Sequence, residues 1–318
     1  MQDTVKEELA INLKGRDFLM LGDYTPQEIR YLIDLAIELK RKQKAGEVYQ
    51  PLKGKTLGMV FEKSSTRTRV SFEVGMYQLG GQALFLSSND LQIGRGEPIA
   101  DTAQVLSRYL DGIMIRTYAH RTVVELARAA TVPVINGLTD LSHPCQVLAD
   151  YQTVLEHKGR LEGLKIAYIG DGNNMAHSLM MGAAKLGMNI AVASPEGYAP
   201  DADMTQNAKD VASRQGSTVL VTQDPKEAIA DADIVYTDVW ASMGFEQEQK
   251  EREIAFAAYQ VNEELVKYAK SDYLFMHCLP AHRGEEVTEA IIDGSHSIIF
   301  DEAENRLHAQ KAIMAAIM

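Results

Sequence analysis

The sequence predicts an α/β protein of two domains, each a mainly parallel sheet flanked by helices. Short apolar runs typical of buried strands alternate with stretches of helical periodicity, which is the pattern of βαβ units. A chain of 318 residues is also longer than a single core usually supports. The strand pattern restarts near Gly159, after a predicted helix. We therefore expect one domain over residues 1–150, a second over 151–300, and a C-terminal helix over 301–318 that packs back on the first.

The elements follow one another regularly from the first helix onward. Thr25-Pro26-Gln27-Glu28 predicts a capped helix with proline at its first position, and apolar residues follow at helical spacing. Strands are predicted at 57–61, 83–86, 112–116, 132–135, 165–169, 190–193, 218–221, 234–237 and 274–276. Further helices are predicted at 70–79, 99–110, 123–130, 144–156, 178–186, from Asp224-Pro225 onward, and at 301–318.

Composition and charge exclude several classes of protein. The net charge of -12 argues against non-specific binding of nucleic acid, since a phosphate backbone would be repelled. Two cysteines, Cys145 and Cys278, are too few for a disulfide framework and fit reduced thiols in the cytoplasm. The sequence has no run of 18 apolar residues and no apolar signal-peptide core at its start, so we expect neither a membrane span nor secretion.

The loop after the first strand concentrates anion-binding groups. Ser65, Thr66 and Thr68 bring hydroxyls, and Arg67 and Arg69 bring guanidiniums, to the start of a predicted helix. Unpaired backbone N–H groups and the helix dipole favour an anion there, and guanidinium matches phosphate in a fork. The alternative is an ordinary capped helix with solvated arginines. The loop lacks the glycines and the Gly-Lys-Ser/Thr ending of a nucleotide-binding P-loop.

Two further candidates lie at the ends of strands or the starts of helices in the first half. Arg116 ends a buried strand, where open α/β sheets bind ligands, although a salt-bridged strand end is as plausible. His143 precedes Pro144 at a helix start, with Gln146 three residues later. A capping or core histidine is the commoner explanation of such a motif, so it gains weight only beside other candidates.

The second half offers polar groups at its predicted strand ends. Gly170-Asp-Gly-Asn-Asn174 follows a strand but breaks the glycine spacing of a dinucleotide fold, so polar recognition or a simple turn is favoured over a nicotinamide-dependent oxidoreductase. Asp238 offers an anion for an amino group, or caps a helix. Cys278 is a nucleophile or a buried thiol, and no activating histidine–acid pair is evident from the sequence.

Four separated motifs resemble the aspartate/ornithine carbamoyltransferase superfamily. They are Ser65-Thr66-Arg67-Thr68-Arg69, His143-Pro144-x-Gln146, Asp238-x-x-x-Ser242-Met243-Gly244 and His277-Cys278-Leu279-Pro280. The first two are similar to the whole superfamily, and the last two to its ornithine branch. The resemblance spans the length of the chain and implies transfer of a carbamoyl group from carbamoyl phosphate to the δ-amine of L-ornithine, giving citrulline and phosphate.

The resemblance also implies the site residues. Carbamoyl phosphate would be bound by Ser65, Thr66, Arg67, Thr68, Gln92, Arg116, His143, Gln146, Cys278, Leu279 and Arg306. Ornithine would be bound by Asn174, Asp238, Ser242 and Met243, and Arg116, His143, Asp238 and Cys278 would be catalytic. Gln92 would reach a neighbouring subunit in a homotrimer or a multiple of trimers. No cofactor or metal is implied, because arginines supply the electrophilic groups.

Other functions stay open at this point. A carbamoyltransferase for another amine, such as putrescine, would not need contacts to an α-carboxylate. A non-catalytic ligand sensor would lack some of the matched residues, but here all are filled with the residue types of the family. If the chain is such an enzyme, its activity is expected to rise with pH, because only the deprotonated, neutral amine of the substrate can attack the carbamoyl carbon. The same reaction serves synthesis and breakdown of arginine, so its place within arginine metabolism is open.

Overall fold

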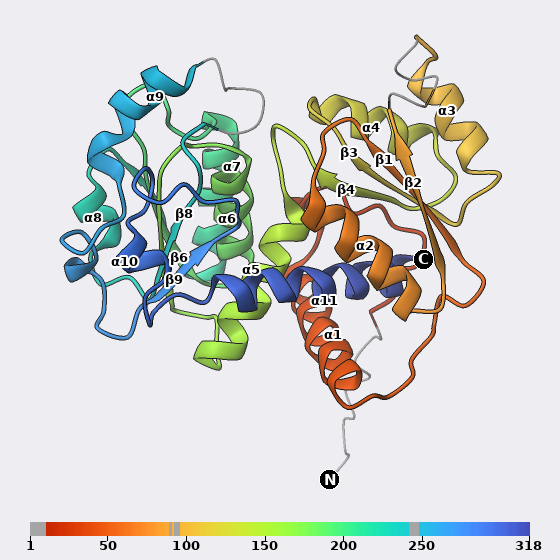
Figure 1. The fold of residues 1–318 in the computed structure, drawn as a ribbon, viewed down its shortest axis with the longest axis horizontal. Helices are drawn as coiled ribbons and strands as arrows, with labels where there is room; N and C mark the ends of the chain where they lie inside the picture. The colour runs from red at the N-terminus through yellow and green to blue at the C-terminus, as the bar shows by residue number, and fades with distance from the viewer. Residues whose placement is uncertain (1–10, 89–90, 92–95, 242–247) are drawn as a thin grey trace.

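Two parallel sheets organise the chain. The structure is a computed structural model that describes residues 11–88, 91, 96–241 and 248–318. The first sheet has the order β2-β1-β3-β4 and the second the order β7-β6-β5-β8-β9, and each pairing is parallel. The strands are β1 (Thr56–Phe61), β2 (Gln82–Ser87), β3 (Gly112–Arg116), β4 (Val134–Leu138), β5 (Lys165–Ile169), β6 (Asn189–Ala193), β7 (Val219–Thr222), β8 (Ile234–Thr237) and β9 (Leu274–His277). The predicted fold class is confirmed, and Figure 1 shows the two sheets in separate lobes.

Helices cover the sheets and connect the lobes. They are α1 (Pro26–Lys44), α2 (Thr66–Gln78), α3 (Ile99–Leu106), α4 (His120–Ala129), α5 (Pro144–Lys158), α6 (Asn174–Lys185), α7 (Ala202–Gln215), α8 (Pro225–Ile229), α9 (Gln249–Phe256), α10 (Glu289–Ile292) and α11 (Ile299–Ile317). Short 3-10 turns lie at Leu21–Asp23, Ala257–Tyr259 and Val266–Tyr268. Within the described ranges, none of these helices has the length and apolar composition that crossing a bilayer requires.

The cap predicted for the first helix is present in α1. The Thr25 hydroxyl accepts a hydrogen bond from the Glu28 N–H at 3.2 Å, and the Glu28 carboxylate accepts from the Thr25 N–H at 2.8 Å. The apolar face of the helix, including Ile29, Leu32 and Ile33, is fully buried. The cap and the apolar face therefore fix the start and the orientation of α1 together.

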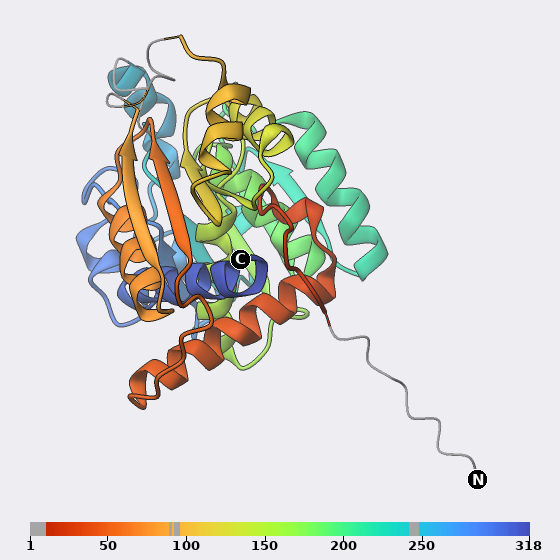
Figure 2. The same cartoon turned by 90° about the vertical axis from the view of Figure 1, so that its right-hand side faces the viewer.

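Helices α5 and α11 join the two lobes. In Figure 1 they run through the space between the sheets, and the turned view in Figure 2 shows α11 lying along α1. Helix α11 packs against α1, α2 and α5. Polar contacts reinforce this packing: the Lys40 ammonium donates to Asn305 Oδ1 at 2.8 Å and to Glu156 at 2.7 Å. The end of the chain thus packs against helices of the first lobe.

The strand order places a topological switch point in each sheet. In the first sheet the chain leaves β1 toward β2 on one side and returns to β3 on the other. In the second sheet β5 lies between β6 and β8 in the same way. Loops at the carboxyl ends of such strand pairs diverge and leave a crevice, which is where open α/β sheets bind ligands. The loops after β1, β3, β5 and β8 are therefore the ones to inspect for a site.

Several predicted boundaries were wrong. Helix α2 begins at Thr66 and not at residue 70, because its first turn is polar and carries no apolar periodicity. Helix α6 begins at Asn174 and not at 178. Helix α3 ends at Leu106 and not at 110. Strand β4 runs over Val134–Leu138 and not over 132–135, because the Asn136 side chain is buried and donates to the Leu19 carbonyl at 2.9 Å.

Candidate active site

A cavity of about 190 Å³ lies between the lobes, where the loops from the two switch points face each other. It is lined by Lys63, Ser64, Ser65, Arg67, Thr68, Arg116, Leu138, His143, Gln146, Asn174, Met175, Asp238, Val239, Cys278, Leu279, Pro280 and Arg306. Four cationic side chains and one carboxylate are in this set. A chain with a net charge of -12 has thus concentrated positive charge at one cavity, which favours an anionic ligand there.

The start of α2 forms one wall of the cavity. Ser65 is the N-cap, and its hydroxyl accepts from the Thr68 N–H at 3.2 Å. Thr68 is fully buried, and its hydroxyl also lies 3.1 Å from Nη2 of Arg306. Thr66 is the first residue of the helix, and its exposed side chain is not part of the cavity lining, so any contribution to ligand binding comes from its backbone N–H. This wall therefore offers hydroxyls and helix N–H groups to an anion.

Arg67 and Arg69 both lie in the first turn of α2, but their side chains point in different directions. Nη2 of Arg67 donates to the Leu279 carbonyl at 2.7 Å across the cavity. Nε of Arg69 donates to Glu73 at 3.1 Å, and its guanidinium lies 3.9 Å from the centre of the Phe85 ring. Two residues apart on an α-helix, the side chains diverge by about 200°. Only Arg67 is available to a ligand in the cavity.

The turn at Leu279 is held in an unusual backbone conformation. Leu279 has φ = 58°, in the left-handed region that leucine rarely adopts. Its N–H donates to Nδ1 of His277 at 2.9 Å, and its carbonyl accepts from Arg67. Both backbone groups of this turn are therefore fixed by side chains from two lobes, which fits a binding role at this position.

Burial and mutual repulsion shape the electrostatics around Arg116 and His143. Arg116 ends β3, and burial, reinforced by repulsion from Arg306 and Arg67, lowers its pKa to about 9. Burial, and then the charge of Arg306, lower the pKa of His143 well below its usual value. Nε of Arg116 and Nδ1 of His143 have no hydrogen-bond partner among the described residues. The cavity thus holds two buried arginines, Arg116 and Arg306, whose pKa values are lowered by burial, beside an imidazole that is neutral, and a bound anion would stabilise the arginine charges.

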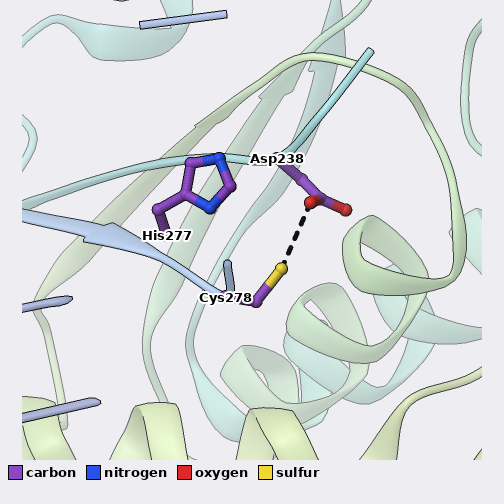
Figure 3. A group of neighbouring side chains, drawn as sticks. All are labelled: Asp238, His277 and Cys278. Carbon is purple, nitrogen blue, oxygen red and sulfur yellow. Dashed lines mark hydrogen bonds between the residues drawn. The ribbon is translucent and has the colours of Figure 1, made fainter. Parts of the chain in front are cut away.

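The opposite wall carries the carboxylate. Asp238 follows β8 and accepts hydrogen bonds from its neighbour's N–H (Val239, 2.8 Å), from Nδ2 of Asn173 (3.1 Å) and from the Cys278 thiol (3.2 Å). Figure 3 shows the Cys278 sulfur pointing at the Asp238 carboxylate. Burial, and then the charge of Asp238, raise the pKa of the Cys278 thiol well above its usual value. Cys278 is therefore a thiol that donates a hydrogen bond, and the alternative of a thiolate nucleophile is not supported.

Asp238, His277 and Cys278 also lie close enough to consider a metal site. Their candidate ligand atoms lie within 4.8 Å of one another. Both ring nitrogens of His277 are engaged, since Nδ1 accepts from Leu279 and Nε2 lies 3.0 Å from Glu286. With the thiol protonated as well, the donor set is arranged for hydrogen bonding and does not fit a metal ion.

The remaining predicted residues are distributed as follows. Gln146 is buried and accepts from Nη1 of Arg306 at 2.6 Å, which draws the last helix into the site. Nδ2 of Asn174 donates to the Thr139 carbonyl at 2.6 Å at the edge of the cavity. The other three predicted residues lie outside the described residues: Gln92, Ser242 and Met243.

Lys63 and Asn173 also contribute at or beside the cavity, although neither was among the predicted site residues. Lys63 lines the cavity next to Ser64 and lies 4.9 Å from the centre of the Tyr118 ring. Asn173 caps α6, accepting from the N–H groups of Met175 and Ala176, and donates to Asp238. An asparagine one residue before a helix is a recognisable cap, so its position could have been found.

The Gly170 turn does not have the geometry of a dinucleotide site. A Cβ on Gly172 would lie 2.1 Å from the backbone nitrogen of Pro200 and 2.4 Å from the carbonyl carbon of Ala199. The Gly172 N–H donates to the Tyr198 carbonyl at 2.9 Å. The glycine is therefore needed for close approach of the chain's own backbone, not of a pyrophosphate, and the oxidoreductase alternative loses its support.

Comparison with models of protein families shows which family the chain belongs to. The carbamoyl-P binding domain of aspartate/ornithine carbamoyltransferase matches residues 16–156, and the Asp/Orn binding domain matches residues 162–317. The chain belongs to the aspartate/ornithine carbamoyltransferase family. Each matched region contains one of the two sheets, and the second extends through α11.

Individual members of the aspartate/ornithine carbamoyltransferase family match over nearly the whole chain. The ornithine carbamoyltransferase of Anoxybacillus flavithermus is 66% identical, covering 97% of this chain and 98% of that protein. The structure of ornithine carbamoyltransferase from Pyrococcus furiosus superposes with a TM-score of 0.94 at 57% identity, covering 97% and 98% of the two chains. An anabolic ornithine carbamoyltransferase from Campylobacter jejuni superposes with a TM-score of 0.88 at 42% identity, covering 94% and 97%.

Proposed function

We propose that the chain is an ornithine carbamoyltransferase (EC 2.1.3.3), which transfers the carbamoyl group of carbamoyl phosphate to the δ-amine of L-ornithine and releases citrulline and phosphate. The observation that carries the proposal is a single cavity in which four cations (Lys63, Arg67, Arg116 and Arg306) face one carboxylate, Asp238. A dianionic acyl phosphate and a cationic amino acid can be held there side by side. The relatives named above carry this enzyme name.

The cation cluster is assigned to carbamoyl phosphate. Ser65, Arg67, Thr68 and the backbone N–H groups at the start of α2 would bind the phosphate, because hydroxyls, a guanidinium and helix N–H groups are the donors that phosphate accepts. Arg116 and His143 would bind the carbonyl oxygen with their unpartnered N–H or ring nitrogen atoms. Gln146, Leu279 and Arg306 would complete the carbamoyl end, and Gln92 keeps the role that the resemblance gives it.

The carboxylate side is assigned to ornithine. Asp238 would attract an amino group, with Cys278 holding the carboxylate in place through its thiol hydrogen bond. Asn174 at the cavity edge would contact the amino-acid end together with Ser242 and Met243. This division leaves one wall for the anion and one for the cation, so the two substrates meet between the lobes.

The reaction follows from these placements. The neutral δ-amine attacks the carbamoyl carbon, and the C–N bond forms as the carbonyl electrons move onto oxygen. Arg116, His143 and Thr68 stabilise that developing oxyanion, acting as donors that are already oriented. The C–O bond to phosphate then breaks, and Arg67 with the start of α2 stabilises the departing charge. The leaving phosphate accepts the proton of the amine, since the strongly lowered pKa of His143 makes its imidazole a poor proton acceptor and Cys278 keeps its own proton.

A comparison of two amines tests the substrate. The purified protein is expected to form citrulline from ornithine and carbamoyl phosphate with a kcat/KM at least about 10²-fold above that for putrescine, because a site that pairs polar groups on a substrate rejects the analogue lacking them. Colorimetric detection of the ureido product measures both reactions. Equal rates would favour the putrescine alternative, and no ureido product from either amine would contradict the proposed function.

We further propose a homotrimer, or a multiple of trimers, in the cytoplasm, acting in arginine metabolism. Exposed apolar side chains on α2 and β2, namely Val70, Val74, Tyr77, Leu84 and Phe85, provide a surface that a neighbouring copy would cover. Both cysteines are free, which fits a reducing compartment. Light scattering is expected to give a native mass of three times 35.2 kDa or a multiple of it. A monomer mass would overturn the trimer.

A further inference from the structure

A second layer of buried acidic groups lies directly behind the cavity. Asp150 on α5 and Glu302 on α11 are each 1% exposed, and neither lines the cavity. The hydroxyl of Tyr236, on β8, lies 3.2 Å from Asp150 and 3.0 Å from Glu302. The backbone N–H of His277 donates to the other oxygen of Glu302 at 2.9 Å. Four elements, α5, α11, β8 and β9, therefore converge on this carboxyl pair, which the reaction described above does not use.

The two carboxyl groups share a proton. Burial raises the pKa of Asp150 to about 7, and burial together with the charge of Asp150 raises the pKa of Glu302 well above its usual value. Both side chains contact the same Tyr236 hydroxyl and the same Gln146 amide nitrogen. Two adjacent carboxylates in a buried site cannot both ionise cheaply, so one keeps its proton and donates it to the other. The pair then carries a single negative charge and retains acceptor oxygens on both members.

This pair and Arg306 together determine the orientation of the Gln146 amide. Nε2 of Gln146 donates to Asp150 at 2.8 Å and approaches Glu302 at 3.3 Å. On its other side, Oε1 accepts from Nη1 of Arg306 at 2.6 Å. A guanidinium only donates, and the carboxyl pair has acceptors facing the amide, so a flipped Gln146 would oppose donor to donor and acceptor to acceptor. The amide is held in one orientation from both ends.

The orientation decides what Gln146 offers to a ligand. Its carbonyl oxygen has two lone pairs, and Arg306 uses one of them. The NH₂ group, by contrast, is turned to the carboxyl pair. Gln146 therefore presents a hydrogen-bond acceptor to the cavity, which matches a ligand N–H and leaves a methyl group or a carboxylate oxygen without a partner.

We propose that Asp150 and Glu302 are positioning residues that make the site selective for a carbamoyl group over an acetyl group, by holding the Gln146 carbonyl oxygen toward the ligand nitrogen. This inference rests on the proposed function. The inference extends the proposed function, because it assigns the choice between acyl groups to a buried pair of residues that touches no substrate.

Two stable phosphonates separate this effect from phosphate binding. Phosphonoacetamide and acetonylphosphonate share the phosphonate and the carbonyl, and they differ only in carrying NH₂ or CH₃. By calorimetry, Asp150→Leu is expected to weaken phosphonoacetamide binding about 10- to 100-fold, as for loss of a hydrogen bond to a charged group, while acetonylphosphonate binding changes less than about threefold. Asp150→Asn keeps an acceptor for Gln146 and is expected to retain the preference of the wild type.

The controls distinguish the possible failures. Asp150→Ala tests the same loss without added bulk if leucine disturbs the fold, and Glu302→Gln, which can still donate to Asp150, is expected to behave like Asp150→Asn. An equal weakening of both ligands in Asp150→Leu and Asp150→Ala, or no change in either, would overturn the inference. Failure of the wild-type protein to bind either phosphonate would instead contradict the proposed function.

Discussion

Arg67→Ala is expected to lower kcat/KM for carbamoyl phosphate by about 10²–10³-fold, the usual effect of removing one oriented donor from a transition state. The substitution removes the guanidinium that faces the departing phosphate and also frees the Leu279 carbonyl, which Arg67 holds at 2.7 Å. Initial rates of citrulline formation at varied carbamoyl phosphate measure the effect.

The same helix provides the matched control. Arg69 lies two residues further along α2, and its guanidinium is paired with Glu73 on the surface, where the two side chains are 48% and 37% exposed. Arg69→Ala is expected to leave kcat/KM within about twofold of wild type and to cost less than about 1 kcal/mol of stability. Equal losses in the two variants would show that Arg67 has no particular role in the cavity.

Asp238→Asn is expected to lower kcat/KM for ornithine by about 10²-fold, because a buried charge that pairs with the substrate amine contributes about 2–3 kcal/mol. Binding of phosphonoacetamide is expected to stay within about threefold, since Asp238 follows β8 in the second lobe whereas Arg67 on α2 and Arg116 on β3 belong to the first. Kinetics at varied ornithine and calorimetry with the phosphonate measure the two sides separately. Parallel losses of both would contradict the division of the cavity.

A second aspartate, at the other end of β8, serves as the control for Asp238. Asp233 immediately precedes β8, at its amino end, where it accepts from Nζ of Lys270 at 2.7 Å and from the Lys165 N–H at 2.9 Å. Asp233→Asn removes an equally buried charge, since the two residues are 5% and 6% exposed. It is expected to lower thermal stability but to leave kcat/KM for ornithine within about twofold. Comparing Asp238→Asn with Asp233→Asn therefore separates the effect of losing a buried charge anywhere on β8 from the effect of losing it at the cavity.

Buried strands were the most predictable part of this chain. The predicted bounds of β3, β5 and β8 agree with the structure, because each is a short run of apolar residues that is almost entirely buried between helices. The α1 cap was equally readable, since both halves of its capping box are local in sequence. Where neighbouring residues or burial on both faces determine an element, contacts with distant parts of the chain have little effect on its bounds.

The starts of α2 and α6 were less predictable for a physical reason. The first turn of α2, Thr66-Arg67-Thr68-Arg69, is entirely polar and carries no apolar signal, and α6 begins with Asn174, a polar residue that lines the cavity. The late start assigned to α2 also hid the divergence of Arg67 and Arg69, which follows from helical geometry once the helix begins at Thr66.

The buried carboxyl pair was not predicted because its members are 152 residues apart in sequence. Each does carry a local signal, since Gln146 and Asp150, and likewise Glu302 and Arg306, are spaced four residues apart on one helix face. A pair of polar residues at that spacing inside an apolar helix face indicates a buried network. Its chemistry becomes readable only when tertiary packing brings the two helices together.

The return of α11 to the first lobe has a consequence for biosynthesis. Arg306 donates a hydrogen bond to Thr68, which lies 238 residues earlier in the chain. The ribosome therefore adds the Thr68 hydroxyl long before the Arg306 guanidinium that binds it. The cavity lacks one of its four cations until the last helix has emerged. Ligand capture is thereby coupled to completion of both lobes, and a polypeptide interrupted before α11 is left with an unfinished pocket.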